Sequence, residues 1–317
     1  MKRDIGLVLD GGGGKGAYQL GVWKALRETG LEQRIAQISG TSVGGLNAAL
    51  MVQGDLELAE KIWFEEIADL KPTRIHMWVS NIIQQYLDFG VFSRSEIECW
   101  LATTCTNHKT KHITCIEPTG DTIRKYRCGK AHYFNMRGCS EAERRKLLTE
   151  DVLDKNVMLA TCALPLLCKS RKIDGLRYRD GGLADNSPAR PLADIPQLWN
   201  QMQPCRYIIV IHLDPVRCDL DAELFANTTL LQIDPSTDTG GFLKGTIRFD
   251  PQNARRLATA GYYESLPLFR TLLANEKREN DAVQIQRLQE RIYQQKAVRY
   301  PKALDRIRRI RKEYADE

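Results

Sequence analysis

The first fifty residues alternate short apolar runs with segments of helical spacing. Residues 5–9 (IGLVL) are apolar throughout, as expected of a parallel strand that is buried on both faces. From Ala17 apolar residues recur at helical spacing until Gly30, which ends the predicted helix. A second strand over 35–38 and a helix of small residues over 43–51 follow. This strand–helix–strand–helix order predicts a parallel sheet and places the fold in the α/β class.

Further elements are expected along the rest of the chain. In order, they are a helix from Asp55 to Phe64, a capping box at 93–96 that starts a helix towards Leu101, a hairpin of strands 112–117 and 122–128 around the turn 118–121, a short strand over 177–180, and a third buried strand over 206–213. The aromatic-rich apolar stretch 74–92 is either a core helix or a lid that contacts lipid. Near the end, Pro301 precedes a predicted basic amphipathic helix over 303–314.

The composition is that of a soluble globular protein, with 317 residues, 43% apolar and 27% charged. Nine cysteines, an odd number without a Cys-x-x-Cys pair, indicate reduced thiols and a cytoplasmic location. The first apolar run is too short for a signal peptide, and no stretch approaches the roughly 20 apolar residues of a membrane span. The formal charge of +6 permits attraction to an anionic membrane surface without requiring it.

A glycine-rich loop follows the first strand and consists of Gly11, Gly12, Gly13, Gly14, Lys15 and Gly16. Such loops before helices bind anions through backbone N–H groups. A P-loop is disfavoured because Lys15 is followed by Gly16-Ala17 rather than by Ser or Thr. A dinucleotide site is disfavoured because the second strand ends without an acidic residue. The loop instead suits a transient oxyanion, to which Lys15 would add positive potential.

The second candidate element is Gly40-Thr41-Ser42-Val43-Gly44, which lies between the second strand and the small-residue helix. In a Gly-x-Ser-x-Gly sequence the glycines permit a sharp strand-to-helix turn that presents the serine at a helix N-terminus. Ser42 is therefore the candidate nucleophile of an acyl transfer, with Gly40 and Gly44 as its structural support.

The candidate base is Asp180, which ends a short strand and is followed by Gly181 and Gly182. A partly desolvated aspartate that accepts a hydrogen bond from the serine can remove its proton directly. A Ser–Asp–His arrangement in chain order would use His212, but that residue lies within a buried-strand pattern rather than on a loop. We therefore expect a dyad without histidine.

The glycine loop, the serine turn and Asp180-Gly181-Gly182, in this order, resemble the patatin-like phospholipases, which are Ser–Asp dyad lipid acyl hydrolases. The resemblance spans about residues 4–270. Connecting features that share it are 160–165 (ATCALP), 186–188 (NSP), 231–235 (LQIDP), and Gly261-Tyr262, which is expected to open the helix after the catalytic domain. One departure is Lys15, where many members have arginine.

The resemblance implies a three-layer α/β/α fold with a mostly parallel central sheet. It also implies Ser42 as nucleophile, Asp180 as base and an oxyanion hole formed by Gly11 to Gly14, with no metal and no cofactor. The expected domains are a catalytic domain over 1–270 and a basic helical extension over 271–317, which the resemblance does not cover.

The predicted function is a phospholipase A-type hydrolase that cleaves ester bonds of membrane glycerolipids at a peripheral membrane surface, from the cytoplasm. Three alternatives remain open: an effector that needs a small-molecule or protein activator, a soluble esterase or thioesterase with the same dyad, and a catalytically inactive lipid-binding module. A nucleic acid partner is not expected, because no recognised module accompanies the basic residues.

Cysteine and histidine are concentrated in one region, at Cys99, Cys105, His108, His112, Cys115, Cys128, His132 and Cys139. Thiolate and imidazole ligands suit zinc. The spacing of these residues is not that of a zinc finger, so unliganded thiols are the preferred interpretation and a structural zinc ion is the alternative.

Overall fold

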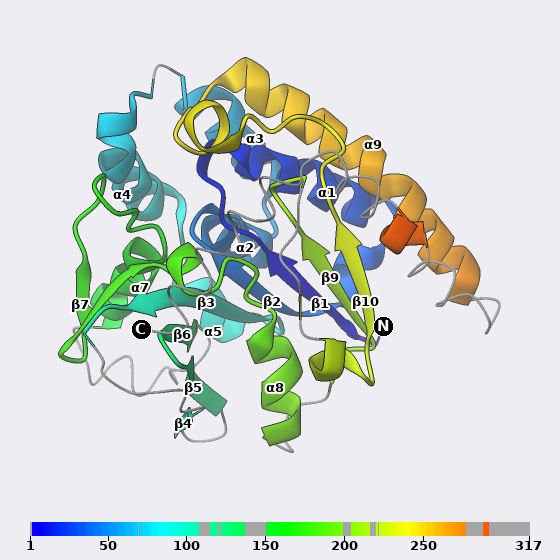
Figure 1. Ribbon diagram of the computed structural model, residues 1–317, viewed down its shortest axis with the longest axis horizontal. Helices are drawn as coiled ribbons and strands as arrows, with labels where there is room; N and C mark the ends of the chain where they lie inside the picture. The colour runs from blue at the N-terminus through cyan, green and yellow to red at the C-terminus, as the bar shows by residue number, and fades with distance from the viewer. Residues whose placement is uncertain are drawn as a thin grey trace.

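The computed structural model describes residues 2–68, 70–107, 115–119, 122–136, 150–198, 204–215, 220, 222–276 and 288–291. One sheet runs through this part of the chain, with helices on both of its faces (Figure 1). Its strands are β1 (Ile5–Leu9), β2 (Ile35–Thr41), β3 (Glu98–Cys105), β4 (Cys115–Thr119), β5 (Thr122–Cys128), β6 (Ala131–Asn135), β7 (Arg171–Ile173), β8 (Leu176–Asp180), β9 (Tyr207–Ile211) and β10 (Thr229–Ile233).

The strand order is β10-β9-β1-β2-β3-β6-β5-β4, with β8 paired to β3 and β7 paired to β8. The strands from β10 to β3 in this order pair in parallel. All the other pairings among the described residues are antiparallel. The fold class is therefore α/β with a central sheet, as predicted. The sheet is mixed, where the resemblance implied a mostly parallel one, because β4 to β6 and the β7–β8 pair are joined by tight turns that only antiparallel neighbours allow.

The helices are α1 (Ala17–Glu28), α2 (Val43–Gln53), α3 (Leu56–Lys61), α4 (Ile75–Tyr86), α5 (Gly90–Arg94), α7 (Glu150–Thr161), α8 (Arg190–Leu198) and α9 (Pro251–Glu276). Short 3-10 or π segments are η1 (Gly13–Gly16), η2 (Leu31–Arg34), η3 (Ile62–Glu66), η4 (Pro72–Arg74), η5 (Gly181–Leu183), η6 (Ala222–Phe225) and η7 (Gly241–Thr246).

The side chains of β1 alternate between two apolar clusters. Ile5, Leu7 and Leu9 belong to the larger cluster, which includes residues of α1, α2 and α9. Val8 belongs to a smaller cluster with residues of α8 and β9. Because successive side chains of a strand point to opposite faces, the two clusters lie on opposite faces of the sheet. Figure 1 shows the same arrangement, with α1, α2 and α9 on one side of the strands and α8 on the other.

The elements predicted around the site are confirmed. The helix after the glycine loop is α1, and Gly30 follows its end with a φ of 76°. The second strand and the small-residue helix are β2 and α2, and the predicted hairpin is β4–β5. The stretch 74–92 is a core helix over most of its length, because Trp78, Ile82 and Ile83 of α4 are buried.

The prediction of a helix that starts at the capping box 93–96 is wrong. Glu96 does not cap a helix but forms an ion pair with Arg3, and Ser95 Oγ instead accepts a hydrogen bond from the N–H of Ile97. The residues that follow form β3, which is paired on both edges and buried at every position after Glu98. Burial in the middle of the sheet outweighs the local helix signal.

The prediction that Gly261 opens a helix is also wrong, because α9 begins ten residues earlier, at Pro251. Gly261 lies in the middle of α9, and a Cβ there would collide with the carbonyl oxygen of Tyr18. Gly21 of α1 meets the backbone of Ala258 and Tyr262 in the same way. The two glycines therefore let α1 and α9 pack closely.

The hairpin β7–β8 was not among the elements predicted from the sequence, apart from the short strand over 177–180. Its turn is Asp174-Gly175, with φ values of 49° and 79°. Two left-handed residues in an Asp-Gly pair are typical of a type I′ turn, which is a strong hairpin signal. Asp180 is the last residue of the second strand of this hairpin, and that strand pairs with β3.

Part of the predicted extension lies outside the described residues. α9 continues through residue 270 without a break, and the predicted helix over 303–314 is not described. The division at residue 270 stays a prediction.

Among the described helices, none combines the length and the apolar character needed to cross a bilayer.

Candidate active site

Ser42 and Asp180 meet because β2 and β8 occupy the same edge of β3. Thr41, the last residue of β2, pairs with Ala102, and Asp180, the last residue of β8, pairs with the next residue, Thr103. The opposite edge of β3 is occupied there by β6. β2 and β8 thus approach end to end, and Ser42, which follows Thr41, lies beside Asp180.

The two side chains are joined by a short hydrogen bond in a buried site. Ser42 Oγ donates to Asp180 Oδ2 at 2.7 Å, and the residues are only 6% and 3% exposed. Ser42 has a φ of 56° and a ψ of −125°, a backbone conformation that L residues rarely adopt. Such strain at a strand-to-helix turn is typical of a serine nucleophile.

Gly40 and Gly44 make this turn possible. A Cβ on Gly40 would collide with the backbone of Gly44, and one on Gly44 would lie 2.6 Å from the carbonyl oxygen of Asp10. The turn therefore needs glycine at both positions, because neighbouring backbone occupies the place of a side chain.

Burial raises the pKa of Asp180 to about 6, although hydrogen bonds from Ser42 and from the N–H of Gly182 favour the carboxylate and lower it. The Gly182 N–H donates to Asp180 Oδ1 at 2.9 Å, and Thr104 Oγ1 donates to the Asp180 carbonyl at 2.7 Å. Gly181 packs so closely on Ala102 that a Cβ would not fit. A carboxylate with this pKa can accept a proton from the serine near neutral pH and return it.

Two residues that hold Ser42 in place were not identified as site residues. The backbone N–H of Ser42 donates to Thr161 Oγ1 at 2.9 Å, and that hydroxyl donates in turn to the Ala102 carbonyl at 2.6 Å. Cys162 Sγ donates to the Ser42 carbonyl at 3.3 Å. Both residues lie in the segment 160–165, which was noted only because its sequence resembles the patatin-like phospholipases. That resemblance gave no indication that these side chains hold the backbone of Ser42.

The glycine loop begins beside the serine. A Cβ on Gly11 would lie 3.1 Å from Ser42 Cβ, and the Gly11 N–H donates to the Asn186 carbonyl at 3.3 Å. The first 3-10 hydrogen bond of η1 runs from the Lys15 N–H to the Gly12 carbonyl. The N–H groups of Gly12, Gly13 and Gly14 therefore have no acceptor within this turn and can bind an anion.

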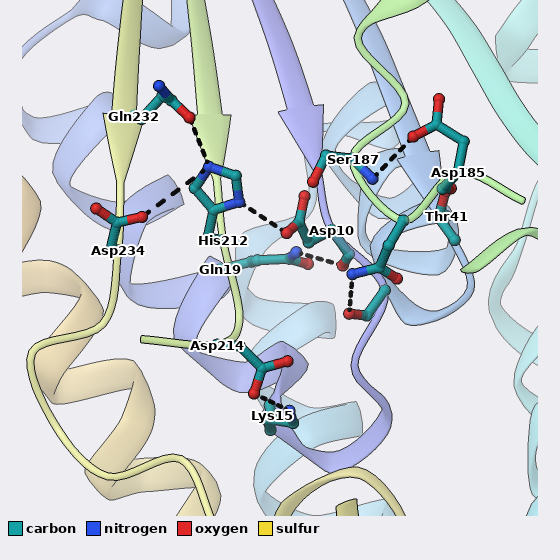
Figure 2. Close-up of polar contacts among 12 residues, drawn as sticks. Asp10, Lys15, Gln19, Thr41, Asp185, Ser187, His212, Asp214, Gln232 and Asp234 are labelled. Carbon is teal, nitrogen blue, oxygen red and sulfur yellow. Dashed lines mark hydrogen bonds and ion pairs between the residues drawn. The ribbon is translucent and has the colours of Figure 1, made fainter. Parts of the chain in front are cut away.

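The rest of the loop is held by contacts with other parts of the chain. Gly13 and Gly14 pack against the backbone of Thr246 and Arg248, and Gly16 packs against the ring of Trp63. The Lys15 side chain is 3% exposed and forms an ion pair with Asp214 (Figure 2). Because Asp214 compensates this charge, Lys15 adds less positive potential at the loop than its sequence position implied.

His212 does not approach the dyad but contacts Asp10, the residue before the glycine loop. Its Nδ1 lies 2.8 Å from Asp10 Oδ2 and its Nε2 lies 3.1 Å from Gln232 Oε1, with Asp234 at 4.0 Å (Figure 2). Burial alone would lower the pKa of His212, but the charge and hydrogen bond of Asp10 outweigh it and raise the pKa. The His212 side chain thus links the ends of β1, β9 and β10 behind the loop.

His212→Gln is expected to lower the free energy of unfolding by about 2 kcal/mol, because Asp10 would keep a hydrogen bond but lose a buried countercharge. Urea unfolding should show this loss, and His76→Gln on the exposed side of α4 is the matched control. Since folding raises the pKa of His212, its contribution to stability is present below pH 6.5, the value of an ordinary histidine, and is lost as the pH rises through the folded-state value. An unchanged midpoint at pH 6 would contradict this prediction.

Half of the Cys/His region can be described. Cys99 and Cys105 are buried, Cys128 is half-buried, and His132 Nδ1 lies 3.1 Å from the Tyr178 hydroxyl. Within the described part of the chain no three His, Cys, Asp or Glu side chains are grouped as metal ligands. Of the other four candidates, His108, His112 and Cys139 lie outside the described residues, and of Cys115 only the backbone is described, so the zinc alternative stays a prediction.

Comparison with known proteins agrees with these features. The model of the family described as patatin-like phospholipase matches residues 7–193, which is more than half of the chain and includes Ser42 and Asp180. A curated relative, lysophospholipase nte1 of Aspergillus terreus (strain NIH 2624 / FGSC A1156), is 54% identical over 48 residues. That alignment covers 15% of this chain and 3% of the relative.

Three solved structures are similar at low identity. VipD from Legionella pneumophila has a TM-score of 0.45 at 13% identity and is matched over 85% of this chain and 67% of its own. Human GIVD cytosolic phospholipase A2, in complex with methyl gamma-linolenyl fluorophosphonate, has a TM-score of 0.45 at 12% identity, over 90% of this chain and 59% of its own. The type III effector protein ExoU has a TM-score of 0.41 at 14% identity, over 85% of this chain and 53% of its own. This chain thus spans about half to two thirds of the solved chains that it matches.

Proposed function

The chain belongs to the patatin-like phospholipase family, and we propose that it is a lipid acyl hydrolase that uses Ser42 as nucleophile and Asp180 as base. The observation that carries this proposal is the 2.7 Å hydrogen bond from Ser42 Oγ to Asp180 Oδ2 in a buried site. Direct activation of a hydroxyl requires a base within hydrogen-bond reach. Here a serine at a strained turn is hydrogen-bonded to a carboxylate whose pKa is raised to about 6.

In the proposed mechanism Asp180 takes the Ser42 proton while Ser42 Oγ attacks the carbonyl carbon of a glycerolipid ester. The oxyanion of the tetrahedral intermediate accepts hydrogen bonds from the loop Gly11–Gly14. We assign Gly12 and Gly13 as its main donors, because the N–H of Gly11 already donates to Asn186. Asp180 then returns the proton to the leaving alcohol.

The second half of the reaction reverses these roles. Asp180 accepts a proton from water as the water oxygen attacks the acyl-Ser42 ester, and it returns that proton to Ser42 Oγ when the fatty acid leaves. The proposed steps transfer protons only through Asp180 and use no metal. We further propose that the substrate is a membrane phospholipid that the enzyme reaches from the cytoplasm as a peripheral protein.

The test is fatty-acid release from phospholipid vesicles with calcium chelated, beside hydrolysis of a water-soluble short-chain ester. Ser42→Ala serves as the blank in both assays. Release from vesicles by the unaltered protein alone supports the phospholipase assignment. Hydrolysis of the soluble ester alone favours the soluble esterase, or an effector that lacks its activator. If neither substrate is cleaved and a fluorophosphonate probe fails to label Ser42, the hydrolase proposal is wrong.

A further inference from the structure

One surface segment starts and ends at the dyad. This segment, called the 164–179 segment below, follows α7 and continues through the β7–β8 hairpin to Asp180. At its start, Cys162 donates to the Ser42 carbonyl, and Ala163 O accepts the N–H of Asp180 at 3.1 Å. Three Cα–Cα steps place the Cα of Leu166 within about 11 Å of that of Ala163. Whatever contacts Leu166 is therefore close to the residues that hold the reacting serine.

The segment presents the most exposed large apolar side chain among the described residues. Leu166 is fully exposed, at 103%, whereas the next most exposed, Tyr263 of α9, is at 67%. Leu166 also has a φ of 69°, a strained conformation for a residue of its size. Its neighbours Leu164, Pro165 and Leu167 are half-buried. Strain that holds an apolar side chain in water suggests a function outside the folding of this chain.

The rest of the segment is strongly basic. It carries five basic residues and a single acidic one, Asp174. The basic residues are Lys169, Arg171, Lys172, Arg177 and Arg179. Asp174 pairs with Arg124 at 3.6 Å, and no described carboxylate forms an ion pair with any of the five. β7 lies at the left edge of the molecule in Figure 1, on the opposite side of the view from most of α9.

We propose that the 164–179 segment is the surface by which the protein docks on an anionic lipid bilayer, with Leu166 inserted among the acyl chains. Lys169, Lys172 and Arg177 are exposed, and their positive charges complement the negative charge of the bilayer. An apolar tip beside basic residues is the pattern of an interfacial anchor. This inference rests on the proposed function, because a membrane substrate is what makes docking beside Ser42 useful. Docking there brings a lipid ester close to Ser42.

The test is sedimentation with equimolar phosphatidylcholine and phosphatidylglycerol vesicles, in a Ser42→Ala background so that lipid is not consumed. Leu166→Gly removes the apolar side chain, and glycine adopts a positive φ without strain. Its vesicle partition coefficient should fall about tenfold. Tyr263→Ala, on α9, is the matched control and should change little.

The charges are tested in the same assay. Lys169→Gln combined with Lys172→Gln should lower the partition coefficient about fivefold per charge at low ionic strength. The matched pair is Lys24→Gln with Lys61→Gln, which changes the net charge equally. The ion pairs that Lys24 and Lys61 form with Glu60 and Glu66 are solvent-exposed, so their loss should have little effect.

Separate outcomes decide the two proposals. With Ser42 restored, every variant should hydrolyse the water-soluble ester at the unaltered rate. The docking proposal is overturned if the 164–179 variants bind vesicles like their controls, or if they lose soluble-ester hydrolysis. If binding responds as expected while the unaltered protein releases no fatty acid, the docking surface stands and the phospholipase assignment fails.

Discussion

Asp180→Asn is expected to abolish ester hydrolysis while making the folded protein more stable at neutral pH. Asparagine keeps the size of the side chain but cannot accept the Ser42 proton, so kcat should fall at least about 10³-fold. The buried carboxylate has its pKa raised from 3.8 to about 6. A shift of this size corresponds to a cost of about 3 kcal/mol when Asp180 is ionised, and the neutral amide avoids part of that cost.

The pH dependence of stability follows from the direction of this shift. Between pH 3.8 and about 6 the folded state binds more protons at Asp180 than the unfolded state does. The contribution of Asp180 to stability therefore falls as the pH rises through this window, and its cost is complete above pH 6. In urea unfolding, the stability advantage of Asp180→Asn should be absent near pH 4 and largest above pH 6.

The same pKa sets the expected rate profile. Since only the carboxylate can act as base, kcat/KM of the unaltered protein should rise with pH up to about 6 and then level off. Ser42→Ala is the matched control, because it removes hydrolysis but keeps the buried carboxylate and its stability cost. An Asp180→Asn protein that is less stable at pH 7, or that retains a tenth of the activity, would argue against the assigned base.

Gly44→Ala is expected to have the largest effect on folding. A Cβ on Gly44 would lie 2.6 Å from the Asp10 carbonyl oxygen and closer still to that of Leu9. Leu9 is held in β1 by pairing with both β2 and β9, so its backbone cannot move away from the added Cβ. The start of α2 would have to move away from the sheet and displace Ser42, at a cost of about 4 kcal/mol or more in the free energy of unfolding.

Gly45→Ala, one residue further along α2, is the matched control. Its Cβ would lie 3.1 Å from the side-chain atoms Leu101 Cδ2 and Thr161 Cγ2, which can shift by a few tenths of an ångström. Alanine also favours the helix, so the net change should stay within about 1 kcal/mol. Thermal and urea unfolding of both variants test the comparison. Equal losses in the two proteins would mean that α2 in general, rather than its contact with β1, limits stability.

The elements around the site could be predicted because their signals are local. The helix α1 with its stop at Gly30, and the turn that places Ser42 between β2 and α2, follow from residues close together in sequence. The hairpin at Asp174-Gly175 carried an equally local signal that was overlooked. The helix expected after 93–96 shows the limit of such reasoning, because pairing in the centre of the sheet decided that β3 is a strand.

The local sequence specifies the candidate groups: a glycine loop, a serine at a sharp turn and an aspartate at a strand end. These are requirements of the local backbone, which neighbouring residues meet or fail to meet. The tertiary structure alone decided that Ser42 and Asp180, 138 residues apart, lie 2.7 Å from each other, because β2 and β8 meet on one edge of β3. It also decided the raised pKa of Asp180 and the contact of His212 with Asp10, since burial and the pairing of distant strands arise only when the chain packs.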